Sequence, residues 1–337
     1  MVKAPPIIDF GAFYSCDSIG KNVLVQQIRE ACQRHGFFQI FNHRVPSDLQ
    51  ESILQQSRDL FSLPLDIKEK YNKDLGTDNR GYERLRAQNF EKRGEGDLKE
   101  GFYLGKDLPK DHPSVVAGKF SQGSNKYPSE IRDPGLFKTT IDTYHATLTS
   151  LSEDILKVLA LTLNLDPNWF EEFAEEPVAI LRLLHYPPQK PDASALERGI
   201  GAHTDFGAIT ILLQDDKGGL QVWDRESSQW ADVTPVKGAL VVNLGNMMMR
   251  WSNDQYLSNL HRVINKSGEE RYSVPFFFSG NPDFVVKCIP SCTNGAQGAK
   301  YPPITVEEWM TARYADTYGG AETKMGDLSS DVEKANN

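Results

Sequence analysis

The sequence lacks long hydrophobic runs. No segment approaches the roughly 18 uninterrupted apolar residues that a membrane-spanning helix needs, and the apolar part of residues 1–10 is too short and proline-rich for a signal peptide. Cysteine is also scarce, with 4 in 337 residues, so we expect reduced thiols. These absences predict a cytoplasmic protein without a membrane partner.

Positive charge is in deficit as well. The 37 Lys+Arg residues stand against 46 Asp+Glu residues, which gives a formal net charge of -9. A surface of this sign disfavours nucleic acid and anionic membranes as main partners. No pattern of interleaved basic and aromatic residues overturns this, so a nucleic-acid partner is not expected.

The part of the chain beyond residue 177 contains a series of short β-rich runs. They cover residues 179–186, 208–214, 220–223, 239–244, 260–264 and 272–278. Gly, Asp and Asn separate them at hairpin-like intervals. No helical pattern lies between them to make parallel crossovers. The pattern predicts a mainly β protein with flanking α, in which the core is a double-stranded β-helix, or antiparallel jelly roll.

The first half of the chain predicts helices that brace this core. Apolar residues at helical spacing indicate helices over 21–35, from Ser47 onward and over 136–163, and Ser47 and Gln50 have the spacing of a capping box. Residues 72–133 show no sustained period, and such long loops are commonly lids or binding segments. We expect four regions: an N-terminal helical and mixed region with the substrate lid at 1–120, bracing helices at 121–176, the jelly-roll core at 177–318, and a flexible tail at 319–337.

One group of residues suggests a metal site. His203 and Asp205 are two residues apart at the edge of a strand pattern, so both side chains can lean to the same side, and His261 lies on a later strand. Two imidazoles and one carboxylate are the ligands that hold non-haem Fe(II) and leave the opposite positions open. Arg271 and Ser273 could then hold the far carboxylate of an acid bound to that iron. The competing interpretation is that these are ordinary hydrogen-bonded histidines of a β protein.

The residues around these positions resemble one enzyme family. The motifs that carry the likeness are Leu181–Pro187, His203–Gly207, Gly219–Val222, Trp251–Asn253, His261–Val263 and Arg271–Ser273. They are similar to those of the Fe(II)/2-oxoglutarate-dependent dioxygenases, in the isopenicillin N synthase-like branch. Ile7–Phe10 and Gly36–Phe38 resemble the N-terminal region of that branch, so the likeness extends over nearly the whole chain. Residues 181–187 and 250–253 resemble fungal-type thymine dioxygenase and secondary-metabolite oxygenases.

The resemblance implies a metal site and a co-substrate site. The implied Fe(II) ligands are His203, Asp205 and His261. The implied 2-oxoglutarate contacts are Arg271, Ser273 and Tyr186. A planar guanidinium can grip a carboxylate with two hydrogen bonds, which agrees with the role of the arginine. The implied reaction uses O2 to oxidise, and specifically to hydroxylate, a small organic metabolite while 2-oxoglutarate is converted to succinate and CO2.

Two positions depart from the commoner pattern of the family. Leu184 stands where many members have an asparagine near the co-substrate, and Asn246 stands where an aspartate is expected. Neither is an implied metal ligand. The departures therefore concern the fine geometry of 2-oxoglutarate binding.

Substrate contacts are expected from the lid and from the mouth of the jelly roll. The candidates chosen by position are Tyr82, Arg84, Gln88, Phe102, Tyr103, Phe206, Trp223 and Phe276. The aromatic residues among them could equally fill the core, and an exposed charged loop is a competing explanation for Arg84.

Three functions stay open at this point. The first is the 2-oxoglutarate-dependent oxidation, with ring-expanding and ethylene-forming variants on the same scaffold. The second is an isopenicillin N synthase-like oxidase or cyclase that uses O2 without 2-oxoglutarate, in which Arg271 and Ser273 bind the carboxylate of the substrate. The third is a non-catalytic jelly-roll binding protein. Succinate formation separates the first from the second, and iron-dependent O2 consumption separates both from the third.

Overall fold

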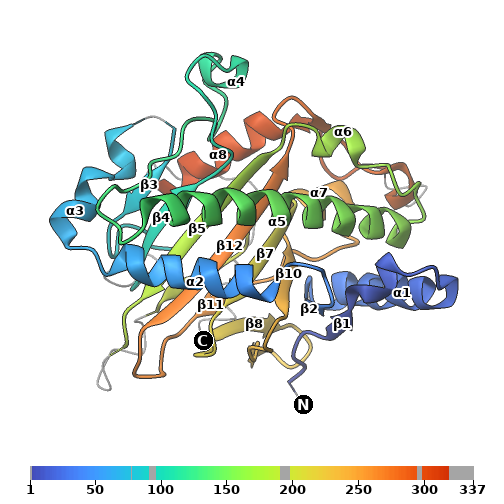
Figure 1. The fold of residues 1–337 in the computed structure, drawn as a ribbon. Coiled ribbons are helices and arrows are strands. Elements are labelled where there is room, and N and C mark those ends of the chain that lie inside the picture. Colours follow the sequence, from blue (N-terminus) through green and yellow to red (C-terminus); the bar gives the residue numbers. More distant parts are fainter. Residues whose placement is uncertain (1, 77, 91–95, 190–197, 294–297, 319–337) are drawn as a thin grey trace.

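Two β-sheets form the centre of the molecule (Figure 1). The computed structural model describes residues 2–76, 78–90, 96–189, 198–293 and 298–318, so the expected tail at 319–337 lies outside the described residues. Within these residues the larger sheet has the strand order β1-β2-β10-β7-β12-β5-β4-β3, and the smaller has the order β6-β11-β8-β9. The two sheets make the jelly-roll core that the sequence predicts.

The strands are short, and most pairs are antiparallel. The larger sheet contains β1 (Ile7–Asp9), β2 (Phe37–Phe41), β3 (Gly81–Glu83), β4 (Glu100–Leu104), β5 (Val178–Tyr186), β7 (Ile209–Gln214), β10 (Leu240–Leu244) and β12 (Arg271–Gly280). The smaller contains β6 (Ile200–His203), β8 (Leu220–Asp224), β9 (Gln229–Asp232) and β11 (His261–Val263), and a separate ribbon pairs β13 (Val285–Val286) with β14 (Ile304–Thr305). Among the described strands, β1 and β2 form the one parallel pair.

Helices cover the outer face of the larger sheet. The helices that lie on this face are α2 (Ser47–Phe61) and α5 (Pro134–Thr162), and α1 (Ser18–Arg34) packs against α5. The other helices are α3 (Leu65–Lys70), α4 (Pro113–Val116), α6 (Glu171–Ala174), α7 (Asn246–Trp251) and α8 (Val306–Tyr318), with short 3-10 turns at Phe10–Tyr14, Lys73–Leu75 and Pro290–Cys292. Figure 1 shows α2 and α5 crossing this sheet side by side. The predicted apolar side of α5 is buried in the main core, where Phe137, Ile141 and Tyr144 are fully buried. No helix in the described part of the chain is long and apolar enough to span a membrane.

Two local expectations were wrong. The predicted capping box at Ser47 does not form, because Pro46 is the residue before the helix and the side chain of Gln50 donates to the backbone oxygen of Val45 at 3.1 Å. Residues 72–133 are not one irregular loop, because β3, β4 and α4 lie within them. Strands of three to five residues are too short to show a period in the sequence, which explains the difference.

The N-terminal region and the jelly-roll core share one sheet. Strand β2 pairs with β10, and β4 pairs with β5. The register of β4 on β5 sets Tyr103 opposite Arg182 and Gly101 opposite Leu184. The segment that follows β3 is thereby anchored beside the strand that carries Tyr186.

Candidate active site

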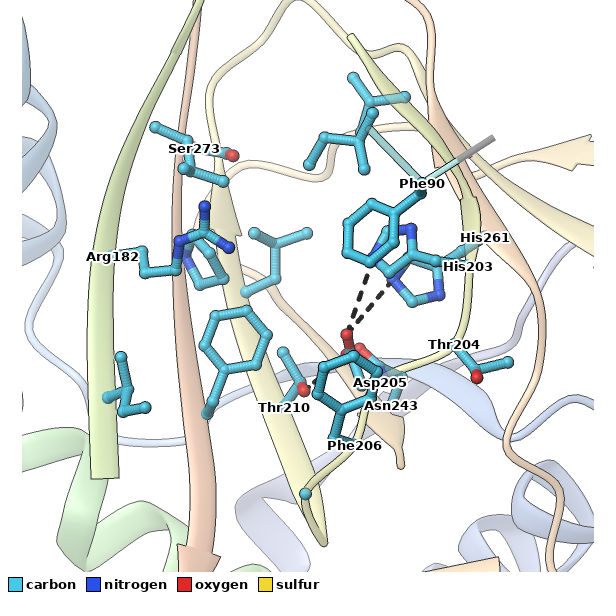
Figure 2. A pocket seen from close by; sticks show the side chains of 18 of the residues that line it. Phe90, Arg182, His203, Thr204, Asp205, Phe206, Thr210, Asn243, His261 and Ser273 are labelled. Atoms are coloured by element: carbon cyan, nitrogen blue, oxygen red, sulfur yellow. Dashed lines mark hydrogen bonds and ion pairs between the residues drawn. The ribbon is translucent and has the colours of Figure 1, made fainter. Parts of the chain in front are cut away.

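A pocket lies between the two sheets and gathers side chains from eight strands (Figure 2). Strand β12 contributes alternate residues, namely Arg271, Ser273, Pro275, Phe277 and Ser279, and β5 contributes Ile180, Arg182, Leu184 and Tyr186. Successive residues of a strand point to opposite faces, so each set shares one face. The register pairs Arg271 with Tyr186 and Ser273 with Leu184, which aligns these two rows along one wall.

His203, Asp205 and His261 converge in this pocket. His203 ends β6 and pairs in register with His261 at the start of β11. Oδ1 of Asp205 lies 3.8 Å from Nε2 of His203 and 3.7 Å from Nε2 of His261, as the dashed lines in Figure 2 show. The three side chains thus offer ligand atoms that all lie within 4.8 Å of one another.

Hydrogen bonds fix the orientation of all three groups. Nδ1 of His203 donates to the backbone oxygen of Gly201 at 2.8 Å, and Nδ1 of His261 donates to that of Asn259 at 3.2 Å. Because a carbonyl only accepts, each Nδ1 carries the proton and each Nε2 presents a lone pair to the centre of the group. This tautomer is the one that metal binding requires.

The carboxylate of Asp205 is held from its other side. Oδ2 accepts hydrogen bonds of 2.6 Å from both Thr210 and Asn243, which leaves Oδ1 directed at the histidines. Two imidazole nitrogens and one carboxylate oxygen with satisfied outer partners fit a divalent iron with further positions open to ligands. The donor set therefore fits Fe(II).

The ionisation states also suit metal binding. Burial, followed by the neighbouring His261, lowers the pKa of His203 to about 3, and the positive charge of Arg182 acts in the same direction. Burial by itself would raise the pKa of Asp205, but the adjacent histidines and the bonds from Thr210 and Asn243 hold it below its ordinary value. At neutral pH, His203 is neutral and Asp205 is ionised, and metals bind these forms.

Arg271 lies fully buried at one end of the pocket. Its Nε donates to the backbone oxygen of Gly218 at 2.5 Å, and its guanidinium carbon lies 4.6 Å from the ring centroid of Tyr186. Its Nη1 is buried without a hydrogen-bond partner among the described residues. Ser273 Oγ lies 3.3 Å from the hydroxyl of Tyr186. A buried guanidinium with an unused N–H beside two hydroxyl groups fits a carboxylate ligand.

The two departures from the family pattern have distinct surroundings. Leu184 lines the pocket opposite Ser273 and adds an apolar surface. Asn246 accepts a 3.1 Å hydrogen bond from the Thr204 hydroxyl, and its backbone N–H donates to the backbone oxygen of Asp205 at 2.8 Å. The asparagine therefore holds the turn that carries Asp205.

The eight substrate candidates separate into two groups. Gln88 and Phe206 line the pocket. The others do not: Tyr82, Phe102 and Phe276 lie in the main hydrophobic core, Tyr103 in a smaller cluster, Trp223 against Trp230 and Leu260, and Arg84 is exposed in an ion pair with Glu69. Position along the chain could not distinguish aromatic residues of the core from those of the pocket.

Several pocket residues were not singled out from the sequence. Arg182 lies four residues before Tyr186 on the same face of β5, and this spacing was the available signal. Phe90 stacks on the ring of His203 with centroids 4.3 Å apart and an angle of 7° (Figure 2). Met310 and Tyr314 reach the pocket from α8, one helical turn apart. The sequence around α8 contains no strand pattern or metal-ligand motif that would have placed Met310 and Tyr314 in the pocket.

Family models match two parts of the chain. Residues 177–280 match the 2OG-Fe(II) oxygenase superfamily, and residues 5–130 match the non-haem dioxygenase in morphine synthesis N-terminal family. The first range includes the three converging ligand residues together with Arg271 and Ser273.

Known proteins are similar along almost the whole chain. The 2-oxoglutarate-Fe(II) type oxidoreductase hxnY of Emericella nidulans is 50% identical over 327 residues, which are 97% of this chain and 94% of that protein. Clavatol oxidase claD of Penicillium crustosum is 36% identical and covers 88% of this chain and 90% of its own. A full-length Neurospora crassa protein, solved in complex with alpha-KG and thymine, superposes with a TM-score of 0.82 at 29% identity, and covers 93% of this chain and 97% of its own.

Proposed function

Because this chain belongs to the 2OG-Fe(II) oxygenase superfamily, we propose that His203, Asp205 and His261 bind its iron. The chain catalyses the Fe(II)- and 2-oxoglutarate-dependent oxidation of a small metabolite. The observation that carries the residue assignment is the convergence of two Nε2 atoms and one Oδ1 atom. Iron bound there supplies, with O2 and 2-oxoglutarate, an oxidation coupled to the formation of succinate and CO2.

Arg271, Ser273 and Tyr186 bind the distal carboxylate of 2-oxoglutarate in this proposal. The buried Nη1 of Arg271 donates to that carboxylate, and the two hydroxyl groups complete its hydrogen bonds. Thr210 and Asn243 hold the Asp205 carboxylate so that one oxygen remains available for the metal. Apolar side chains such as Leu184 and Val263 exclude water from the space around the co-substrate.

The decisive experiment is anaerobic titration of the protein with Fe(II) and 2-oxoglutarate. The wild-type protein should develop the visible charge-transfer absorption of a chelated 2-oxo acid and should then form succinate when O2 is admitted. His203→Ala should develop no such absorption. Normal absorption and succinate formation by this variant would contradict the assignment of the metal ligands.

The oxidase that works without 2-oxoglutarate is not favoured. The similar oxidoreductase of Emericella nidulans carries 2-oxoglutarate in its name, and the Neurospora crassa complex contains alpha-KG. If Arg271 instead bound a substrate carboxylate, O2 consumption would proceed without succinate. The succinate assay therefore distinguishes the two functions directly.

We propose hydroxylation of a small ring compound as the specific reaction, in secondary metabolism. The support is that one similar protein is named a clavatol oxidase and another binds thymine. Gln88, Phe90, Phe206 and Phe277 line the pocket and are the proposed substrate contacts.

We also propose a cytoplasmic location. All four cysteines are free thiols, which supports this location.

We retain the expected division of the chain into 1–120, 121–176 and 177–318. The lid function of the first region is supported by Gln88 and Phe90, which reach the pocket from the segment between β3 and β4. Deletion of residues 84–90, with 2-oxoglutarate binding as the control, tests this part of the proposal. Loss of substrate-dependent succinate formation with intact co-substrate binding is the expected result.

A further inference from the structure

A second arginine, Arg182, projects into the pocket, and it lies further along the pocket wall from Arg271. Arg182 lies in the middle of β5, is 7% exposed, and lines the pocket. Figure 2 shows its guanidinium directed into the cavity, across from His203 and His261. Four residues of strand separate Arg182 from Tyr186, a distance of about 13 Å along the backbone. Arg182 is therefore separate from the proposed 2-oxoglutarate site.

A buried network holds this guanidinium in place. Nη2 of Arg182 donates to Oε2 of Glu83 at 3.0 Å, and Lys99 donates to the same oxygen at 2.8 Å. The hydroxyl of Tyr103 donates to Oε1 of Glu83 at 3.0 Å, and the guanidinium carbon lies 4.3 Å from the Tyr103 ring centroid. Burial would raise the pKa of Glu83, but Lys99 and Arg182 lower it to about 2. The result is a charged donor set in a fixed orientation on the cavity wall.

A structural role alone does not explain this arrangement well. Burying ions is costly, and a buried ion pair is often no more stabilising than packed apolar side chains of similar volume. Lys99 and Arg182 both pair with Oε2 of Glu83, at 2.8 and 3.0 Å. Arg182 also lines the pocket, where a ligand can contact it.

Two further polar groups of the pocket point to a ligand. Gln88 is 4% exposed, and its Oε1 has no hydrogen-bond partner among the described residues. The fully buried hydroxyl of Ser279 also has none within the described part of the chain. A buried polar atom without a partner is destabilising until a ligand or another group bonds to it. Gln88 and Ser279 both line the pocket, so a bound molecule can supply the missing partners.

The remaining walls near these groups are aromatic. Phe90, Phe206, Phe277 and Tyr314 line the same pocket. Figure 2 shows Phe90 beside His203 and Phe206 beside Asp205, so these rings border the proposed metal position. Aromatic walls favour flat apolar rings, which stack or contact them edge to face.

We propose that Arg182 is the substrate-orienting residue, and that it donates to an sp2 oxygen of a small flat ring compound while Gln88 makes a second hydrogen bond. The sp2 oxygen belongs to a carboxylate or to a ring carbonyl, and both have the same acceptor geometry toward a guanidinium. This inference rests on the proposed function, because it assigns the substrate class of the same site.

The test measures binding without turnover. Protein loaded with Mn(II) and 2-oxoglutarate under anaerobic conditions is titrated by calorimetry with three sets of compounds: ring carboxylates, ring amides, and matched rings without an oxygen acceptor. We expect one of the first two sets to bind at least about 10-fold more tightly than the third, since a hydrogen bond to a charged group contributes about 1.5 to 3 kcal/mol. The set that binds more tightly shows whether the acceptor oxygen belongs to a carboxylate or to a ring carbonyl.

Variants assign the preference to the named residues. Arg182→Gln should remove the preference for acceptor-bearing rings, and Arg182→Lys should restore part of it. Arg80→Gln is the matched control, because Arg80 is 1% exposed and bonds to Ser121 away from the pocket lining. The control should leave the preference unchanged. If Arg182→Gln does not fold, Gln88→Met, in the segment after β3, should still weaken binding by about 3- to 10-fold, as loss of one neutral hydrogen bond predicts.

The failure of this inference can be distinguished from failure of the proposed function. Arg182→Gln should bind 2-oxoglutarate as the wild type does. Wild-type protein that does not bind 2-oxoglutarate would contradict the proposed function. Wild-type protein that binds 2-oxoglutarate but shows no preference for acceptor-bearing rings, or a preference that survives in Arg182→Gln and Gln88→Met, would overturn the role of Arg182 alone.

Discussion

Asn243 donates a 2.6 Å hydrogen bond to Oδ2 of Asp205, the carboxylate oxygen that is not directed at the two histidines. Asn243 belongs to β10 of the larger sheet, whereas His203 and His261 belong to the smaller one. The hydrogen bond therefore ties the proposed metal site to both sheets. Its geometry makes the orientation of Asp205 depend on how the sheets pack.

Asn243→Leu should lower the affinity for a divalent metal by about 10- to 100-fold, the usual effect of losing an outer partner of a metal ligand. Calorimetric titration with Mn(II) measures this. Asn125→Leu is the control, because the Asn125 amide bonds to Gly105 and Tyr127 and does not line the pocket. An unchanged affinity in Asn243→Leu would mean that Thr210 alone orients the carboxylate.

Removal of the metal should abolish succinate formation. Treatment with EDTA should stop the reaction, and Fe(II) should restore it in the wild type because the ligand atoms are preformed. Asp205→Asn should not recover with Fe(II), since the amide lacks the charge that the metal requires. Circular dichroism checks that this variant is folded. Full recovery in Asp205→Asn would show that another group completes the site.

Arg271→Gln should weaken 2-oxoglutarate binding by at least about 10-fold, because each charge-assisted hydrogen bond contributes about 1.5 to 3 kcal/mol. The change should appear in the KM for 2-oxoglutarate more than in that for the substrate. Arg262→Gln serves as the control, since Arg262 bonds to Gln221 and stacks on Trp230. A rise confined to the KM for the substrate would instead favour the oxidase that binds a substrate carboxylate at Arg271.

Acid should destabilise the protein through His145. Burial lowers the pKa of His145 to about 4, while an exposed histidine titrates near 6.5. The unfolded chain therefore binds more protons between these values, and the free energy of unfolding should fall by about 3 kcal/mol as the pH drops from about 6.5 to about 4.

Urea denaturation at several pH values measures the His145 effect by comparing the wild type with His145→Gln. Other groups titrate in both proteins, so the difference between their pH profiles isolates this histidine. The profile of the variant should be flatter across this window. Parallel profiles would show that the pKa of His145 is the same in the folded and unfolded states.

Gly245→Ala should damage the turn that carries Asp205. An added Cβ would lie 2.2 Å from the backbone oxygen of Gly207 and 3.0 Å from that of Asp205. Such overpacking costs about 1 to 3 kcal/mol of stability, and displacement of Asp205 should also weaken metal binding. Gly135→Ala is the control, because its Cβ would meet only Asp133 Oδ1, at 3.5 Å. Thermal denaturation and Mn(II) titration measure both effects.

The sequence by itself determined the jelly-roll core, the family and the iron and 2-oxoglutarate dependence of the reaction. Its local patterns carry this information, because alternation along β5 and β12 and the His203-Thr204-Asp205 spacing are set by a few neighbouring residues. Side chains two residues apart share a face wherever the strand lies. This spacing places His203 with Asp205 and Arg271 with Ser273, whereas the resemblance of the surrounding motifs supplied Tyr186 and the roles of the six proposed metal and co-substrate residues.

Only the tertiary structure decided which other side chains surround them. Tyr82 and Phe102 lie in the core, while Phe90 reaches the pocket, although nothing in the local sequence separates these aromatic residues. Alternation shows which residues of a strand share a face, but strand pairing decides what that face meets. The contact of Glu83 with Arg182 joins residues 99 positions apart, so it exists only because β3, β4 and β5 pair in one sheet.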